Sequence, residues 1–251
     1  MNHYLQAILR GIVQGLTEFL PISSSGHLLL FSALGCWEES LFIDIMLHIA
    51  TLLVVIIVFR KELLWIIKNP LSDETKFLII ATIPTAILAG VIRYFLEEEM
   101  VVLLPFCFLI NGFILLSTKF INQDKRVMHS TLKSGIITGI MQGFACLSGI
   151  SRSGSTFFAT KLIGLDEEKS PSTIFLLSIP IILGSALVEG LGYHGGAQID
   201  ALELVLAMIF AFISGFLAIK TFVKLLKSGK IWYFSFYSFL IGIATFLIVN
   251  F

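Results

Sequence analysis

The apolar positions of this chain fall into six long runs of about twenty residues, with short polar segments between them. About twenty helical residues are needed to cross a hydrocarbon core roughly 30 Å thick. The pattern therefore predicts six membrane-crossing helices. They cover residues 41–59, 77–95, 101–120, 172–190, 203–222 and 232–249.

Two further segments are helix-like but broken. Residues 20–26 and 148–154 are rich in Pro, Gly and Ser, and each break is followed by a second apolar run of only about nine residues. Nine residues at about 1.5 Å of rise span about half a bilayer. Each broken segment is therefore predicted to be a re-entrant helical hairpin that enters and leaves the membrane on one side.

The two broken segments are copies of one another. Residues 11–35 reappear without a gap as 139–163, with nine identical positions. Such a repeat in an apolar chain is typical of a duplicated membrane unit. We expect one membrane domain over residues 1–251, with repeats at about 1–121 and 132–251. Each repeat holds one hairpin and three crossings, and because three is odd, the second copy must be inverted.

The distribution of basic residues tests this topology, because cytoplasmic helix ends are enriched in Lys and Arg. Fourteen Lys and Arg residues fall at the ends that the topology places in the cytoplasm, against Arg10 and Arg93 at the opposite face. The first hairpin then enters from outside and the second from the cytoplasm. Their tips should meet near the middle of the membrane.

Composition supports a polytopic, all-α integral membrane protein. Hydrophobic residues make up 57% of the chain, charged residues only 14%, and the mean hydropathy is +0.95, whereas soluble domains average roughly 25% charged residues. The net charge of zero gives no basic surface for nucleic acid. Arg10, Gln14 and Glu18 interrupt the first apolar run, which makes it a poor signal peptide. The three cysteines show no paired or metal-binding spacing.

The breaks carry the chemistry expected of an anion site. The first N–H groups of a helix have no partner within the helix, and they favour negative charge together with the helix dipole. Hydroxyl groups are dense around both breaks, which hydrocarbon would not tolerate without a polar ligand or water. These hydroxyls belong to Ser23, Ser24, Ser25, Ser151, Ser153, Ser155 and Thr156.

The differences between the copies are more informative than the identities. The first copy has Glu18 and His27 where the second has Cys146 and Ser155, and Arg152 of the second copy replaces Ser24. An arginine inside a membrane is costly unless it is paired, and its planar group suits phosphate oxygens. Gln14 lies one helical turn before Glu18 and shares its face.

The strings QGLTEFLPISSSGH and SGISRSGST resemble the two signature motifs of the bacterial undecaprenyl-pyrophosphate phosphatase family, the bacitracin-resistance type. The first motif falls on Gln14, Glu18, Ser23, Ser24, Gly26 and His27, and the second on Gly149, Ser151, Arg152, Ser153 and Thr156. This chain departs from the family pattern at two positions. Ser148 replaces the usual proline, and Gln14 stands in place of Glu, which removes one possible metal ligand and leaves Glu18.

The resemblance implies hydrolysis of a C55 polyprenyl pyrophosphate to the monophosphate carrier of cell-wall synthesis, in the bacterial plasma membrane, with bacitracin resistance as a consequence. It also implies assistance by Mg²⁺ or Ca²⁺, with Glu18 as the metal ligand, and a site that opens outward. Glu18, Ser24, His27 and Arg152 are the predicted catalytic residues. The pyrophosphate is expected to contact Gln14, Ser23, Ser25, Gly26, Ser151, Ser153 and Thr156.

The residues themselves leave the nucleophile open. Ser24, activated by His27 or Glu18, would attack to give a phosphoseryl intermediate, or water would attack directly. We favour the serine, because direct attack by water leaves the hydroxyl cluster less explained. His27 alone would be read as structural, and Asp44 and His48 as a pair on one helix face, with support of the site as the alternative.

Other functions compete with hydrolysis. Inverted repeats with broken helices also build secondary transporters, so the chain could move a small anion or flip a lipid phosphate, alone or in addition to cleavage. A transporter has less use for a carboxylate, an imidazole and a nucleophilic hydroxyl at one point. A purely structural scaffold would need no such convergence. Whether the protein forms a homodimer is left open by the sequence.

Overall fold

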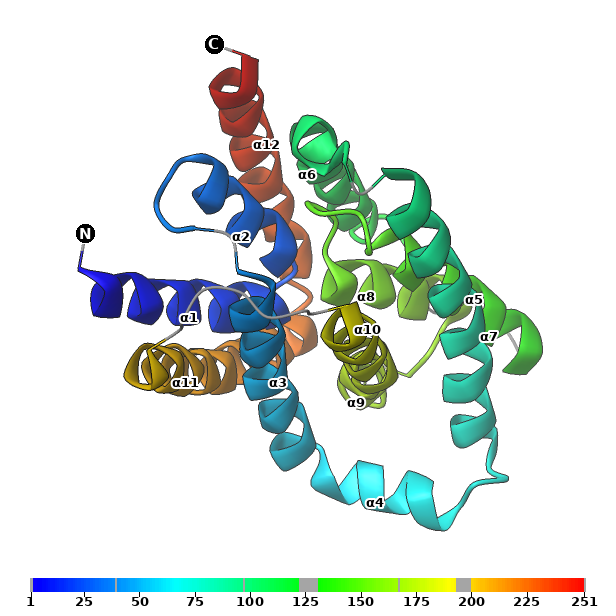
Figure 1. Ribbon diagram of the computed structural model, residues 1–251. Coiled ribbons are helices and arrows are strands. Elements are labelled where there is room, and N and C mark those ends of the chain that lie inside the picture. Colours follow the sequence, from blue (N-terminus) through cyan, green and yellow to red (C-terminus); the bar gives the residue numbers. More distant parts are fainter. Residues whose placement is uncertain are drawn as a thin grey trace.

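The computed structural model describes residues 2–38, 40–96, 98–121, 131–166, 168–192 and 200–250, and all regular structure in these ranges is helical (Figure 1). Six helical segments are long and apolar enough to cross a membrane. They are Leu41–Val58, Asp73–Leu96, Met100–Ser117, Ser170–Val188, Ala201–Lys227 and Ile231–Val249. The prediction of six crossings in an all-α membrane protein is confirmed.

The helices follow the order that the repeat predicts. The first half contains α1 (His3–Phe19), α2 (Ser24–Ala33), α3 (Leu41–Val58), α4 (Arg60–Lys68), α5 (Asp73–Leu96) and α6 (Met100–Ser117). The second half contains α7 (Thr131–Phe144), α8 (Arg152–Ile163), α9 (Ser170–Leu176), α10 (Ser178–Gly192), α11 (Ala201–Lys227), η2 (Ile231–Tyr233) and α12 (Phe234–Asn250). Both predicted breaks are present, between α1 and α2 and between α7 and α8.

Two details differ from the pattern-based expectation. The short helix α4 lies between the first two crossings, and the fourth crossing is divided into α9 and α10 at Leu177. Pro180 accounts for the division, because a proline has no N–H to donate to the carbonyl four residues earlier, that of Leu176, and its ring crowds that carbonyl. The re-entrant course of the two broken segments, and the repeat boundaries, stay predictions.

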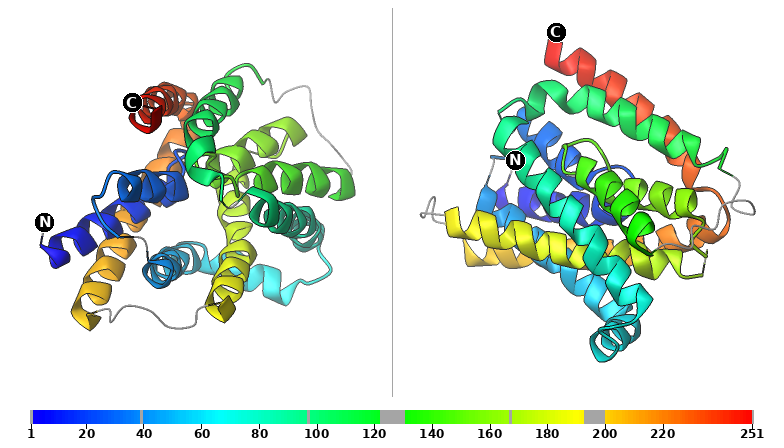
Figure 2. Two further views of the ribbon diagram at one scale, coloured as in Figure 1. Left: turned by 45° about the horizontal axis from the view of Figure 1, so that its top comes forward. Right: turned by 90° about the vertical axis from the view of Figure 1, so that its right-hand side faces the viewer.

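The two halves interlock through the arms of the broken segments. Helix α1 packs along α11, α7 along α5, and α6 along α12 (Figures 1 and 2). Gly11 and Gly15 make the first contact close, because a Cβ on either would meet the backbone of Ala207 or Ala211. Small residues drive helix association in lipid by allowing such approach. Each half thus supplies the support for the first arm of the other half.

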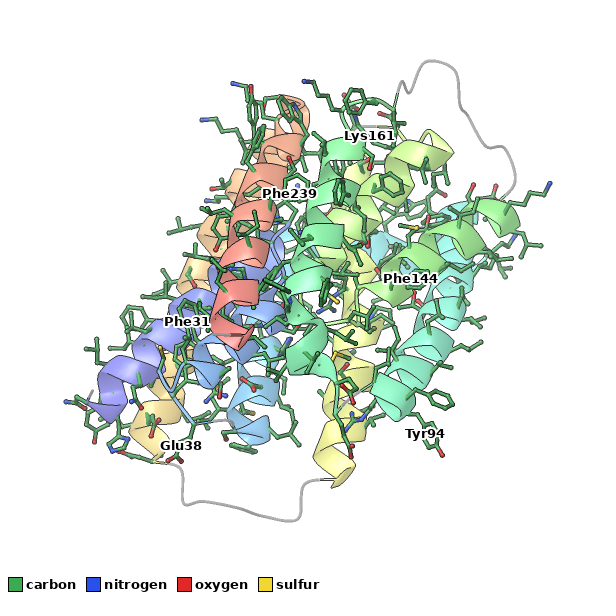
Figure 3. All side chains as sticks on the ribbon, turned by 90° about the horizontal axis from the view of Figure 1, so that it is seen from above. Phe31, Glu38, Tyr94, Phe144, Lys161 and Phe239 are labelled. Atoms are coloured by element: carbon green, nitrogen blue, oxygen red, sulfur yellow. The ribbon has the colours of Figure 1, made fainter. Side chains whose placement is uncertain are left out.

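Basic residues from separate segments lie at one end of the helical bundle. The ammonium group of Lys119 stands 4.1 Å from the centre of the Trp232 ring, and Lys169 pairs with Glu74 at 3.0 Å. These contacts join the end of α6 to η2 and the start of α5 to α9. Lys125 and Arg126, two of the fourteen basic residues predicted at cytoplasmic ends, lie outside the described residues. Large apolar side chains such as Phe144 project from the helices, as lipid-facing residues do (Figure 3).

Candidate active site

The breaks of the two halves meet, and their chain segments touch directly. The Ser23 hydroxyl accepts hydrogen bonds from Gly149 N–H, in the other break, at 3.0 Å and from Gly26 N–H at 3.3 Å. A Cβ on Gly26 would lie 2.7 Å from the backbone nitrogen of Gly149. The prediction that the two tips come together is therefore satisfied in the structure, at residues more than a hundred positions apart.

Glu18 is the centre of the polar contacts at this junction. Its carboxylate is buried near the end of α1 and accepts from Ser24 Oγ at 2.5 Å, from Gln14 Nε2 at 3.1 Å and from Arg152 Nη2 at 2.8 Å. Ser24 begins α2 and Arg152 begins α8. A carboxylate, a hydroxyl and a guanidinium from three helices thus converge on one point.

The guanidinium of Arg152 uses only part of its donor capacity. Nη2 binds Glu18, whereas the buried Nη1 has no hydrogen-bond partner in the part of the chain that the structure describes. A buried donor left unsatisfied costs about 1–3 kcal/mol. Gln14 shows the complementary pattern, because Nε2 donates to Glu18 and the buried Oε1 has no described partner. One donor and one acceptor are thus available beside the same carboxylate.

The hydroxyl groups of the second break cap the start of α8. Ser151 Oγ accepts from Gly154 N–H at 3.2 Å and lies 3.1 Å from Ser153 Oγ. Thr156 donates to Gln142 Oε1 at 3.2 Å, within the second half, and is fully buried. In the first break, Ser25 Oγ lies 3.5 Å from Ser23 Oγ. These hydroxyls surround the junction, but the hydroxyl of Thr156 is bonded within the pair formed by α7 and α8.

His27 does not contact Ser24 through either ring nitrogen. Nδ1 lies 2.6 Å from the carbonyl oxygen of Ser23, and Nε2 lies 2.7 Å from the hydroxyl of Tyr237. The two rings also stack, with centroids 5.7 Å apart. In this arrangement Glu18, and not His27, accepts the hydrogen bond that Ser24 donates. Tyr237 on α12 was not singled out from the sequence.

The pairing expected between Asp44 and His48 is different in the structure. The carboxylate of Asp44 binds Arg10 at 2.8 Å, and His48 Nδ1 lies 2.8 Å from the backbone oxygen of Asp44. His48 Nε2 then faces Glu18, 3.7 Å from Oε2. His48 therefore lies beside Glu18, which is the position that the alternative interpretation requires. The burial of Arg10 could not be predicted from the pattern, because its partners are Asp44 on α3 and two carbonyls of the segment just before that helix.

The junction offers oxygen ligands, but few carboxylates. In the described ranges no group of three or more His, Cys, Asp and Glu residues is placed to hold a metal ion. Mg²⁺ is commonly held by one or two carboxylates together with substrate phosphates and water. Glu18, the unpartnered Oε1 of Gln14 and the neighbouring hydroxyls fit that pattern. They do not form a closed site made of protein ligands alone.

The comparisons with known proteins all indicate the same family. A family model described as "Bacitracin resistance protein BacA" matches residues 7–244. The chain is 38% identical to a protein of Carboxydothermus hydrogenoformans, over 97% of this chain and 96% of the relative, and 38% identical to one of Treponema denticola, over 95% and 94%. A Bacteroides fragilis protein is 34% identical over 98% of both chains. This chain belongs to the BacA family. All three relatives are named "Undecaprenyl-diphosphatase".

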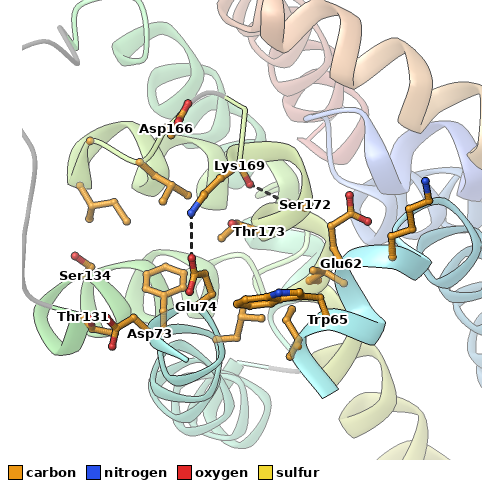
Figure 4. A pocket seen from close by; sticks show the side chains of 18 residues that line it. Glu62, Trp65, Asp73, Glu74, Thr131, Ser134, Asp166, Lys169, Ser172 and Thr173 are labelled. Atoms are coloured by element: carbon orange, nitrogen blue, oxygen red, sulfur yellow. Dashed lines mark hydrogen bonds and ion pairs between the residues drawn. The ribbon is translucent and has the colours of Figure 1, made fainter. Parts of the chain in front are cut away.

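In this BacA-family chain one cavity lies away from the junction. It has a volume of about 770 Å³ and lies among α4, the start of α5, α7, and the end of α8 with α9 (Figure 4). Trp65 and Phe77 supply apolar walls, and the Lys169–Glu74 pair crosses it. None of the predicted site residues lines this cavity.

Proposed function

We propose that this protein hydrolyses undecaprenyl pyrophosphate to undecaprenyl phosphate and inorganic phosphate, which recycles the lipid carrier of cell-wall synthesis. The observation that supports this most is the meeting of Glu18, Ser24 and Arg152 at the junction of the breaks. Cleavage of a pyrophosphate needs a nucleophile, a proton acceptor and positive charge at the transferred phosphoryl group. The names of the relatives indicate the same activity.

Arg152 is proposed to bind the phosphoryl group that is transferred. Its unpartnered Nη1 donor would take a pyrophosphate oxygen while Nη2 keeps its bond to Glu18. The first N–H groups of α2 and α8 add positive potential from two directions. Such oriented donors stabilise the charge that develops in the transition state, typically by a few kcal/mol for each donor.

Ser24 is proposed as the nucleophile, with Glu18 as its base. Their hydrogen bond of 2.5 Å is the geometry expected of an activated hydroxyl. As Ser24 Oγ bonds to the terminal phosphorus, its proton passes to Glu18 and the bridging P–O bond breaks, which releases undecaprenyl phosphate. Glu18 passes that proton to the departing undecaprenyl phosphate and is again ionised. Water then attacks the phosphorus of the phosphoseryl group and gives a proton to Glu18, the bond between Ser24 Oγ and phosphorus breaks, Glu18 returns the proton to Ser24 Oγ, and phosphate leaves. His48, 3.7 Å from Glu18, is placed to support the charge changes of that carboxylate.

Mg²⁺ or Ca²⁺ is proposed to enter the site with the pyrophosphate. The ligands on the protein would be Glu18 and the Oε1 atom of Gln14, which has no other described partner. When bound, the ion would neutralise charge on the pyrophosphate oxygens. The residues of the chain would still hold the nucleophile, its proton and the transferred phosphoryl group.

The protein is a multi-pass membrane protein, and we place it in the bacterial plasma membrane with the site open to the outside. The excess of Lys and Arg at one end of the bundle supports this orientation. The isoprenoid tail would lie along the apolar crossings, where large exposed side chains already face lipid.

The test is phosphate release from undecaprenyl pyrophosphate by protein purified in detergent, with Mg²⁺ and then with a chelator. Arg152→Ala and Glu18→Gln should each lower kcat by about 10²–10³-fold, because each removes a group that acts in the transition state. Arg60→Ala is the control, since Arg60 is an exposed arginine on α4 and its side chain bonds only the Ile57 carbonyl among the described contacts. Lipid binding without phosphate release by folded wild-type protein would instead favour a transporter of lipid phosphate.

A further inference from the structure

A single amide side chain in α6 is bonded to both breaks. Asn111 is fully buried in the apolar run FCFLINGFILL, where an unpaired amide would be costly. Its Nδ2 group donates to the carbonyl oxygen of Pro21 at 3.0 Å, and its Oδ1 atom accepts from the N–H of Ser151 at 2.9 Å. Pro21 belongs to the first break and Ser151 to the second.

The two bonded positions lie close in sequence to the reacting groups. Ser151 directly precedes Arg152, and Pro21 is three residues before Ser24 and three after Glu18. A shift of either break relative to α6 would therefore change where Arg152 stands relative to Glu18. Misplacement by about 1 Å can cost about 10²-fold in rate.

The amide is itself held from α12. The second proton of Nδ2 goes to Ser238 Oγ at 2.9 Å, so three hydrogen bonds fix the plane of the amide. Gly112 helps to bring α12 near, because a Cβ there would collide with the Phe239 ring. Both Asn111 and Ser238 are fully buried, so these bonds are shielded from water.

Other parts of α6 form the floor of the same junction. A Cβ on Gly149 would meet Cys107 Cβ at 2.7 Å and the Phe108 backbone nitrogen at 3.1 Å. The Phe108 ring also packs edge-on against His27, with centroids 5.3 Å apart. Helix α6 thus contacts both breaks by packing, and Asn111 adds directional bonds to that packing.

We infer that Asn111 is the positioning residue that sets the Glu18–Arg152 geometry by holding the two breaks on α6. This inference rests on the proposed phosphatase function. An amide is the side chain that the place requires, because it donates toward Pro21 and Ser238 while it accepts from Ser151. A carboxylate lacks both donors, and leucine, of similar size, lacks donors and acceptor alike.

The kinetic test compares Asn111→Asp and Asn111→Leu with wild type in the phosphate-release assay. Both should lower kcat by about 10²-fold, with KM changed less than about threefold, because geometry at the reacting centre is lost while the lipid tail still binds. In an Arg152→Ala background the same changes should cost almost nothing further, since the residue acts through Arg152. Ser238→Ala, which removes one of the three bonds, should give a smaller fall and covers the case in which Asn111→Leu fails to fold.

Thr245→Val is the matched control. Thr245 is a fully buried hydroxyl on α12 that bonds only its own helix, to the Ile241 carbonyl at 2.7 Å, among the described contacts. It should change kcat less than about threefold, and its effect should add to that of Arg152→Ala. Additive behaviour of Asn111→Asp with Arg152→Ala, or unchanged kcat, would overturn the inference while wild-type activity still stood.

Amide hydrogen exchange tests the same inference without any turnover. Asn111→Asp should speed exchange in peptides covering 147–153 and 20–26, because Ser151 N–H and the neighbouring turns lose their anchor. Thr245→Val should leave those peptides unchanged. If wild type released no phosphate, the proposed function would fail, yet faster exchange would still show that Asn111 holds the breaks. Unchanged exchange in Asn111→Asp would refute its role.

Discussion

At the scale of single residues, the site depends on positions where the two copies of the repeat carry different side chains. Glu18 and Arg152 occupy different positions of the repeat, and neither has its counterpart in the other copy. The junction brings them within 2.8 Å. One copy thus supplies the carboxylate and the proposed nucleophile, Ser24, and the other supplies the cation.

Ser23 combines an unusual backbone conformation with hydrogen bonds that join the two breaks. It has a φ of 71°, a conformation that residues other than glycine rarely adopt. Its hydroxyl also accepts the N–H groups of Gly26 and Gly149. The serine is kept at an unfavourable backbone angle because that hydroxyl joins the two breaks.

Replacement of Ser23 should therefore show two opposing effects on stability. Ser23→Ala leaves two buried N–H groups without an acceptor and should cost about 1–3 kcal/mol for each. Ser23→Gly loses the same bonds but relieves a backbone penalty on the order of 1–3 kcal/mol, so it should be the milder change. The measurement is the apparent melting temperature in detergent.

Ser117→Ala serves as the comparison, because Ser117 bonds only its own helix among the described contacts, and it should melt as wild type does. Equal melting temperatures for Ser23→Ala and wild type would show that the hydroxyl does not hold the breaks.

At the scale of elements, close helix packing carries each broken segment. Helix α1 lies along α11 with Gly11 facing the backbone of Ala207, and α7 lies along α5 with Gly139 facing Ala81. These equivalent contacts recur in the two halves, because Gly11 and Gly139 are the same position of the repeat. In lipid, where apolar burial gives little preference for one helix over another, such small-residue contacts select the partner.

Replacement by alanine should have opposite effects on stability at Gly11, which is closely packed on α1, and at Gly90, which is open on α5. Gly11→Ala places a methyl group against the carbonyl of Ala207 and should destabilise by about 1–3 kcal/mol, as overpacking does. Gly90→Ala on α5 meets no atom within 4 Å, and should stabilise by about 0.5–1 kcal/mol, because alanine is the better helix former. Thermal unfolding of the two purified variants checks this. A Gly11→Ala protein that melts no lower than wild type would contradict close packing of α1 on α11.

At the scale of the whole molecule, the basic residues at one end of the bundle support the proposed orientation in the membrane. Helix ends that carry Lys119, Lys161 and Lys169 come together, and Lys161 reaches the Thr118 carbonyl at 3.5 Å. The acidic Glu98 and Glu99 lie at the other end of α5 with Arg93 and Tyr94. The proposed cytoplasmic placement of the basic end agrees with the usual enrichment of Lys and Arg at cytoplasmic helix ends.

Single cysteines should report this orientation. In a background without Cys36, Cys107 and Cys146, Tyr94→Cys should react with a membrane-impermeant maleimide on intact cells, because Tyr94 is 82% exposed and lies at the predicted outer face. Lys227→Cys, exposed at the end of α11, should react only after permeabilisation. Reversed labelling would place the junction on the opposite side and overturn the proposed outward-facing site.

The sequence by itself determined the class of protein, the six crossings, the two breaks, and Glu18 and Arg152 as candidate residues of the junction. Long apolar runs have one stable solution in lipid, a helix, because no water is present to satisfy an open backbone. Glu18 and Arg152 were identifiable because a charge is costly in such a run unless it has a partner.

The tertiary structure decided which groups face one another. It turned His27 toward Tyr237, His48 toward Glu18 and Asp44 toward Arg10, and it placed Asn111 between the breaks. Periodicity identifies the face of a helix but not the helix that covers it. That choice depends on how closely pairs such as α1 and α11 approach, and therefore on contacts between residues some two hundred positions apart.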